Sequence, residues 1–250
     1  VPEHRPKVTM MTALPLTWSR QALDMSAVLA GQAEPAPIMS AMAAYFDVTA
    51  VDAIDPAALS RTGILWLAHP PALPPEQLVA IDRWVRGGGR ALILADGLLA
   101  SDGQYPLGDP RNPPVTSLLT PLLDHWVLTL AAPGRVEHVS RSIEGWQIEM
   151  VAPGRFTAAG RDCIVQSNGL LAECRIGQGR ALLVADADWL DASHWQGMAA
   201  PGQPLDPMLN SGDAPALLAA LFGRLSDAPT RRPLIRPLWT RQRLIPPAQH

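Results

Sequence analysis

Apolar positions along this chain follow two patterns that alternate. Short runs, such as Leu92 to Leu94 and Leu182 to Val184, are apolar without interruption, as expected for strands covered on both faces. Longer segments place apolar residues at helical spacing, for example Leu78, Ile81 and Val85. This alternation predicts an α/β fold in which mostly parallel strands are covered by helices.

The same pattern assigns the main elements. Strands are predicted at Val8 to Leu14, Val48 to Val51, Ile64 to Ala68, Ala91 to Ala95 and Ala181 to Ala185. Helices are predicted at Pro37 to Phe46, Pro74 to Arg86 and Ala214 to Leu225. The glycines at 87–89 lead from a helix into a strand, whereas a phosphate-binding loop leads from a strand into a helix. We therefore interpret them as a helix stop with glycine in the left-handed conformation.

Residues 135–176 are divided by Gly and Pro into short segments, which predicts antiparallel hairpins inserted before the last parallel strand. The pair Asn168-Gly169 is typical of a two-residue hairpin loop, and counting outward from it places Cys163 opposite Cys174. This register makes them a hydrogen-bonded pair about 5.5 Å apart at Cα. The cysteines form either a cross-strand disulfide, which would favour the periplasm, or two buried thiols.

We expect one domain over residues 1–227, with the insertion at 135–176, followed by a Pro/Arg-rich tail over 228–250. The chain starts at Val1, in a polar stretch with two prolines, so we expect that a leader or membrane anchor has been removed before it. The expected location is therefore the periplasm, or a membrane anchor with this domain exposed. The 20 Lys and Arg are scattered among 23 acids, giving a net charge of -3, which leaves no basic stripe for nucleic acid.

Two segments carry a resemblance to a known family. The segment Gly177 to Leu190, followed by Asn210 and the helix from Asp213, resembles the closing part of GldG-like auxiliary proteins of ABC-type transport systems. The segment Leu73 to Asp96 is similar to the helix, glycine turn and strand in the middle of that domain. The resemblance implies an open, flavodoxin-like sheet of the class I glutamine-amidotransferase kind, with helices on both faces. It also implies an ABC permease and ATPase, or another membrane protein, as partners, and it brings no catalytic residue.

Candidate binding residues follow the predicted strands. Open α/β sheets bind ligands at the carboxyl ends of their strands, where His69, Asp96, Asp186 and Asp188 fall. Their spacing matches no diagnostic metal pattern, so we predict no metal and no cofactor. The alternative is that these acids cap neighbouring loops and pair with arginines.

Aromatic rings provide a second set of candidates, because the chain has eight Trp against two Tyr and three Phe. Trp18, Trp189 and Trp195 are expected near the strand ends, where they either stack on a sugar or apolar small molecule or pack in the core. The turn-rich loop at 102–114 is either a lid over these strand ends or an extended connection.

A working amidotransferase needs a nucleophilic Cys in a tight turn from strand to helix, supported by a His and an acid. Here the strand ending at Ala68 runs into His69-Pro70-Pro71, whose prolines forbid that turn, and both cysteines fall in a hairpin. We therefore predict a non-catalytic binding or scaffolding domain of an ABC-type transport system. The alternatives are a hydrolase or metal-dependent enzyme that uses the strand-end acids, or a carbohydrate-binding module.

Overall fold

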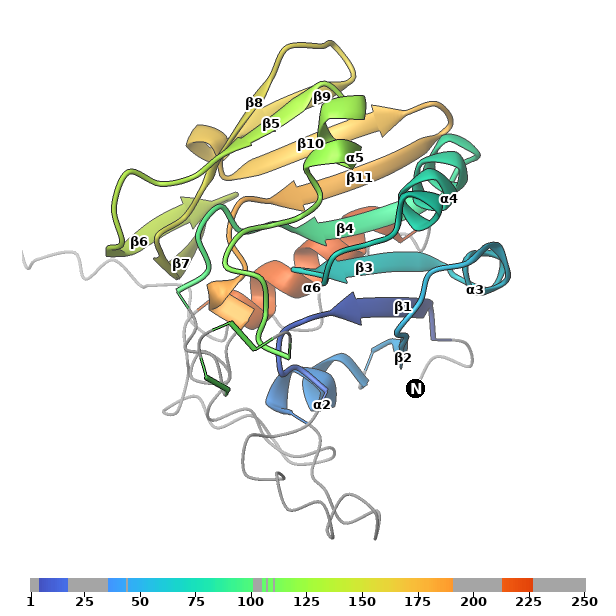
Figure 1. Cartoon of the computed structure of the whole chain (residues 1–250), viewed down its shortest axis with the longest axis horizontal. Helices are drawn as coiled ribbons and strands as arrows, with labels where there is room; N and C mark the ends of the chain where they lie inside the picture. The colour runs from blue at the N-terminus through green and yellow to red at the C-terminus, as the bar shows by residue number, and fades with distance from the viewer. Residues whose placement is uncertain are drawn as a thin grey trace, which may run out of the picture.

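A seven-stranded sheet forms the centre of the computed structural model, which describes residues 5–17, 36–43, 45–100, 105–106, 108–109, 111–190 and 213–226 (Figure 1). Its strands are β1 (Lys7–Thr12), β2 (Asp47–Ala50), β3 (Ile64–Ala68), β4 (Arg90–Leu94), β9 (Cys163–Gln166), β10 (Leu171–Ile176) and β11 (Gly179–Val184). Two small sheets pair β5 (Leu128–Ala131) with β8 (Arg155–Ala158) and β6 (His138–Ile143) with β7 (Trp146–Val151). The helices are α2 (Pro37–Ala43), α3 (Pro56–Ser60), α4 (Pro75–Arg86), α5 (Thr120–His125) and α6 (Ala214–Leu225), with short 3-10 turns η2 (Ser167–Gly169) and η3 (Asp188–Leu190).

The strand order of the large sheet is β2-β1-β3-β4-β11-β10-β9. The first five strands are parallel, and their order is the 2-1-3-4-5 order of flavodoxin-like folds. Strands β10 and β9 extend the sheet in antiparallel fashion. The structure thus confirms the predicted open, mostly parallel sheet with inserted antiparallel hairpins.

Both faces of this sheet are covered, as the uninterrupted apolar strands predicted. On one face, α2, α6 and the β6–β7 hairpin pack together, and Phe222 of α6 meets the ring of Trp66 edge-on at 5.4 Å between ring centroids. On the other face, α3, α4, α5 and the β5–β8 pair form the second core cluster. Figure 1 shows α4 and α5 in front of the sheet and α6 behind it. Strand β3 is buried at all five positions because it lies between these layers.

Most predicted boundaries lie within a few residues of the observed ones, and β3 and α6 match at both ends. Strand β1 ends at Thr12 instead of Leu14 because the Thr12 hydroxyl donates to the Ala68 carbonyl and accepts from the Leu14 N–H, which turns the chain. Helix α4 ends as predicted, with Gly88 at φ +111° donating to the Val85 carbonyl. The short helices α3 and α5 were not predicted.

The hairpin of β9 and β10 has the predicted register, with Gln166 opposite Leu171 and Cys163 opposite Cys174, and the two cysteines form a disulfide. Their Cα atoms are 4.0 Å apart, which is closer to the spacing of a non-hydrogen-bonded pair than to the expected 5.5 Å. The prediction that Cys163 and Cys174 form a hydrogen-bonded pair is therefore wrong. The loop contains three residues with positive φ, namely Ser167, Asn168 and Gly169. The Arg175 N–H donates to the Asp162 carbonyl, so the hydrogen-bonded pair is the one next to the cysteines.

Some expectations concern residues outside the described ranges. These are Trp18, Trp195, the tail at 228–250 and parts of the loop at 102–114. Within the described residues, no helix has the length and apolar character that a membrane span requires.

Candidate functional site

The carboxyl ends of β4 and β11 lie side by side and carry equivalent acids. These strands pair in parallel, Leu94 opposite Val184, and the Ala95 N–H donates to the Val184 carbonyl at 2.9 Å. Two residues beyond each strand end lies an aspartate, Asp96 after β4 and Asp186 after β11. The repeated Gly-Arg-Ala-Leu segments of the sequence are therefore neighbouring strands in register, and their acids are brought together.

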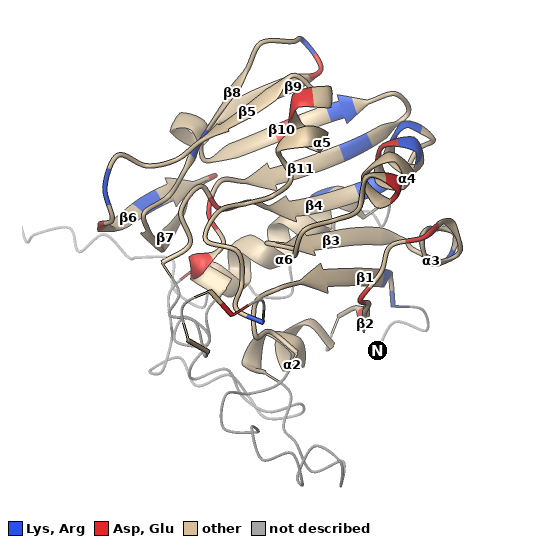
Figure 2. Ribbon diagram, viewed as in Figure 1, with Lys and Arg blue, Asp and Glu red and all other residues tan. Residues whose placement is uncertain are grey.

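Asp188, in η3, completes a cluster that we call the acidic triad: Asp96, Asp186 and Asp188. One carboxylate oxygen from each lies within 4.8 Å of the others. Asp96 and Asp186 are fully buried and Asp188 is 7% exposed. Figure 2 shows acidic residues in the loops that follow β4 and β11.

Backbone groups hold two of the three carboxylates. Asp96 accepts from the Leu98 N–H through Oδ1 and from the Ala187 N–H through Oδ2, both at 2.9 Å. Asp188 accepts from the Ala100 N–H at 3.0 Å through Oδ2. Each of these acids thus links the loop after β4 to the loop after β11, which agrees with the predicted alternative that strand-end acids cap loops.

Asp186 differs from its neighbours because neither of its buried oxygens has a hydrogen-bond partner. Burial raises the pKa of Asp186 well above the usual value, and the charges of Asp96 and Asp188 raise it further, while nearby N–H groups only moderate the rise. Burial also raises the pKa of Asp96, to about 6, against the lowering effect of its backbone hydrogen bonds. The triad therefore cannot carry three negative charges at neutral pH without a counter-charge.

His69 does not join the triad. Its backbone is left-handed, with φ +45°, and its Nε2 lies 2.7 Å from the Pro114 carbonyl oxygen, while the buried Nδ1 has no partner. Burial lowers the pKa of this imidazole, and the contact with Pro114 opposes that effect. The described geometry makes His69 an anchor for the loop around Pro114, so three of the four strand-end candidates converge.

Trp189 is fully buried in the core, and its indole N–H donates to the Asp186 carbonyl at 3.1 Å. Its ring offers no exposed face for stacking on a ligand, and it acts as packing beneath the triad. Of the three tryptophans named from the sequence, it alone lies within the described residues.

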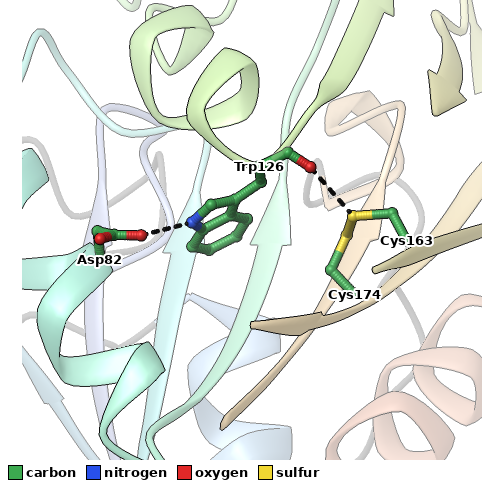
Figure 3. Close-up of a disulfide and its surroundings, with 4 residues drawn as sticks. All are labelled: Asp82, Trp126, Cys163 and Cys174. Atoms are coloured by element: carbon green, nitrogen blue, oxygen red, sulfur yellow. Dashed lines mark hydrogen bonds between the residues drawn. A yellow bond between two sulfur atoms is a disulfide. The ribbon is translucent and has the colours of Figure 1, made fainter. Parts of the chain in front are cut away.

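The disulfide lies on the other side of the large sheet, beside α5 (Figure 3). The Cys163 sulfur is 3.7 Å from the Trp126 carbonyl oxygen, and the Trp126 indole N–H donates to Asp82 Oδ1 of α4 at 2.9 Å. Both sulfurs are bonded to each other, so neither is a thiol.

One cavity was missed by the sequence reasoning. It has a volume of about 530 Å³ and is lined by Arg135, Arg141, Arg155, Glu137 and the turns around them. Two copies of the tetrapeptide Ala-Pro-Gly-Arg, at 132–135 and 152–155, contribute most of this lining. That repeat was the available signal, since the two copies flank the β6–β7 hairpin. We call this the arginine cavity.

The arginine cavity adjoins the strand ends. The Gly154 N–H donates to the Ala185 carbonyl at 2.7 Å, immediately before Asp186. A Cβ on Gly97 would lie 2.9 Å from the Ala132 Cα, so the residue after Asp96 packs directly under the cavity wall. Figure 2 shows basic residues on β6 and on the loop that leads into it. Three arginines and Glu137 thus line a cavity next to the buried acids.

A family model described as ABC-type uncharacterized transport system matches residues 5–130. The chain belongs to this family. The matched part runs from before β1 into β5, so it contains His69 and Asp96 but ends before Asp186 and before the residues that line the arginine cavity. No curated protein matches the chain.

Several solved structures are similar to this member of the transport-system family at low identity. An exo-β-1,4-mannosidase from Opitutaceae bacterium strain TAV5 has 12% identity and a TM-score of 0.48, over 88% of this chain and 36% of that one. A cytoplasmic protein from Salmonella typhimurium LT2 has 12% identity and a TM-score of 0.44, over 72% of this chain and 87% of that one. A ThuA-like protein from Bacteroides uniformis ATCC 8492 has 9% identity and a TM-score of 0.42, over 80% and 97%. The chain thus spans about a third of the mannosidase.

Proposed function

We propose that this chain is a non-catalytic binding domain of an ABC-type transport auxiliary protein, and that it takes an anionic small molecule in the arginine cavity. The observation that carries the proposal is that three arginines, Arg135, Arg141 and Arg155, line one cavity at the strand ends. Its volume of about 530 Å³ falls within the usual range of ligand sites, roughly 300–1,000 Å³. Guanidinium groups recognise carboxylates and phosphates through paired hydrogen bonds, which gives the ligand class.

The charge balance of the cavity supports an anion. Arg135 contacts Glu137 at 2.7 Å, but this pair is exposed, so it contributes little and can rearrange around a ligand. Arg155 donates to the neutral amide oxygen of Asn168 at 2.9 Å, which orients it without cancelling its charge. Arg141 donates to the carbonyl of Ser140 at 3.4 Å. The lining therefore contains three arginines and one glutamate, which leaves an excess of positive charge.

The non-catalytic part of the proposal rests on the residues that amidotransferase chemistry would use. Cys163 and Cys174 are joined in a disulfide on β9 and β10, so neither supplies a thiolate. His69 occupies the end of β3, with Nε2 against the Pro114 carbonyl. The same disulfide supports a periplasmic or otherwise oxidising location.

A metal-dependent enzyme is the second candidate, because three of the predicted strand-end side chains do converge. Their exposed fractions, between 0 and 7%, argue against it, since a substrate needs direct access to a catalytic metal. A hydrolytic turnover that is lost when Asp186 is replaced would favour this enzyme over the binding domain.

A thermal-shift titration tests the ligand class. Inorganic phosphate, citrate and glucuronate are added to the purified chain, to the double variant Arg135→Ala/Arg155→Ala and to Arg61→Ala as an arginine control at the C-cap of α3. One of the anions should raise Tm of the wild type and of the Arg61 variant. A response that survives in the double variant, or no response to any of the three anions, would exclude this cavity as their site.

A second experiment tests the transport partner. The full-length protein is co-expressed with the ABC permease and ATPase of its own organism, and each subunit is tagged in turn. The expected result is stoichiometric co-elution in size-exclusion chromatography, while an unrelated membrane protein of similar abundance serves as the control. Separate elution under mild detergent would contradict the assignment to such an assembly.

A further inference from the structure

The most anomalous polar group in the described structure is the Asp186 carboxylate. Both of its oxygens are buried and without a hydrogen-bond partner, whereas Trp66, His69 and Arg180 each have a single buried nitrogen without one. Burying an ionised carboxylate without compensation costs far more than burying an indole or imidazole nitrogen. This carboxylate therefore needs a positive partner, and a proton or a metal ion are the two candidates.

The surroundings of Asp186 favour a metal ion because they supply further oxygen ligands already held in position. Asp96 and Asp188 each offer an oxygen within the same 4.8 Å cluster. The N–H groups of Leu98, Ala187 and Ala100 fix these two carboxylates from outside. A carboxylate oxygen that accepts one N–H retains a second lone pair, so these bonds orient the ligands without consuming them.

We propose that Asp96, Asp186 and Asp188 form a divalent-cation site of the Ca²⁺ class. Oxygens that share one Ca²⁺ at roughly 2.3–2.6 Å lie up to about 5 Å apart, which accommodates the 4.8 Å spread of the triad. Mg²⁺, at roughly 2.0–2.1 Å, requires ligand oxygens no more than about 4.2 Å apart. A bound ion ties the loop after β4 to η3. The site is distinct from the arginine cavity and does not depend on an anionic ligand there.

Calorimetric and thermal titrations test the site directly. The purified full chain is stripped with EDTA and titrated with CaCl₂, MgCl₂ and MnCl₂. At about 100 times Kd, Ca²⁺ should raise Tm by more than about 5 °C. Asp186→Asn should abolish the shift, because it removes the charge while keeping the size of the side chain. Asp124→Asn, at an exposed acid of α5, is the matched control and should respond like the wild type.

Terbium luminescence provides a readout that does not depend on stability. The Trp189 indole N–H donates a hydrogen bond to the Asp186 carbonyl, so the indole lies close enough to sensitise Tb³⁺ held by the triad. Excitation of tryptophan should give Tb³⁺ emission that Ca²⁺ displaces. Trp189→Phe should lose most of this emission while Ca²⁺ binding measured by calorimetry remains.

Two results would overturn the proposal. The first is the absence of any calorimetric heat, Tm shift or Tb³⁺ emission with the wild type, which would assign the counter-charge to a proton. The second is an undiminished response in Asp186→Asn, which would place the ion elsewhere. If that variant does not fold, Asp188→Asn takes its place, because Asp188 lies at the edge of the triad with 7% exposure.

Discussion

Asp96 and Asp186 occupy equivalent positions on adjacent parallel strands, two residues beyond the paired residues Leu94 and Val184. The pairing forces two carboxyl groups together in a region from which water is excluded. The Asp96 carboxylate accepts hydrogen bonds from two backbone N–H groups, whereas neither oxygen of the Asp186 carboxylate has a hydrogen-bond partner. This asymmetry between two otherwise matched acids underlies the behaviour expected of the site.

Asp186→Asn should stabilise the metal-free protein near neutral pH. The substitution removes a carboxyl charge that has no hydrogen-bond partner to lose, so a gain of about 1–3 kcal/mol in the free energy of unfolding is expected. Urea unfolding in EDTA at pH 7.5 measures it. Asp96→Asn is the contrasting variant: it should destabilise, because one of its two accepting oxygens becomes an N–H donor. Equal effects of both substitutions would contradict this account.

The pH dependence of the metal-free protein follows from the same groups. Asp96, with a pKa of about 6 in the folded state, holds its proton more tightly there than in the unfolded chain. Stability from this group is therefore full below about pH 4 and is lost as pH rises toward 6. Unfolding free energies measured in EDTA between pH 4 and 7 should decline, and Ca²⁺ should reduce the decline. A flat profile in EDTA would show that this carboxyl does not retain its proton on folding.

Asp82 should produce the opposite dependence. Burial alone would raise its pKa, but hydrogen bonds from Arg86 and Trp126 outweigh that effect and hold the pKa below the usual value. Its contribution is present above the unfolded pKa and is lost as pH falls through the folded one. In Trp126→Phe, the pKa of Asp82 measured by NMR titration should move upward. An unchanged pKa would mean that the indole bond in Figure 3 does not stabilise the charged carboxylate.

The disulfide should contribute about 2–3 kcal/mol, since it closes a short loop in the unfolded chain. Dithiothreitol should lower the free energy of unfolding of the wild type, measured by urea denaturation, by that amount. The double variant Cys163→Ala/Cys174→Ala should be equally destabilised and indifferent to the reductant. A wild type that is unaffected by complete reduction would show that the β9–β10 hairpin does not need its covalent link.

Phe222 anchors α6 to the large sheet, where it contacts Phe46 and Trp66. Phe222→Ala should cost about 3–5 kcal/mol because it leaves a large hole in a fully buried position. Phe222→Leu, which fills part of that volume, should cost clearly less, and chemical denaturation distinguishes the two. A loss below about 1 kcal/mol for the alanine variant would mean that α6 is not integral to this face of the core.

The sequence was sufficient for the parts of the fold that depend on local pattern. Strand β3 was predicted at both ends because five consecutive apolar residues need cover on both faces. The position of Cys163 opposite Cys174 followed from the Asn168-Gly169 loop alone. That the two cysteines form a non-hydrogen-bonded pair did not follow from this loop. It depends on the positive φ of Ser167, which the identity of a serine residue does not predict.

The candidate site was only partly predictable for a related reason. Asp96 and Asp186 followed from their common place after buried strands. The arginine cavity depends on β5 pairing with β8 across the β6–β7 hairpin, a long-range contact that no local pattern specifies. The separation of His69 from the triad could not be predicted either, because its contact partner, Pro114, comes from a loop 45 residues further along the chain. Burial of Trp189 likewise depends on the tertiary core.

The two edges of the large sheet, β2 and β9, are four residues long, and β9 is bonded covalently to the strand beside it. Short edges offer few unpaired backbone groups to an incoming strand, which limits the growth of the sheet from one molecule into another. A partner chain therefore gains little by adding a strand to this domain. Recognition through side chains on its loops is the mode of assembly that such a sheet leaves open, and the same short edges should protect the domain from aggregation.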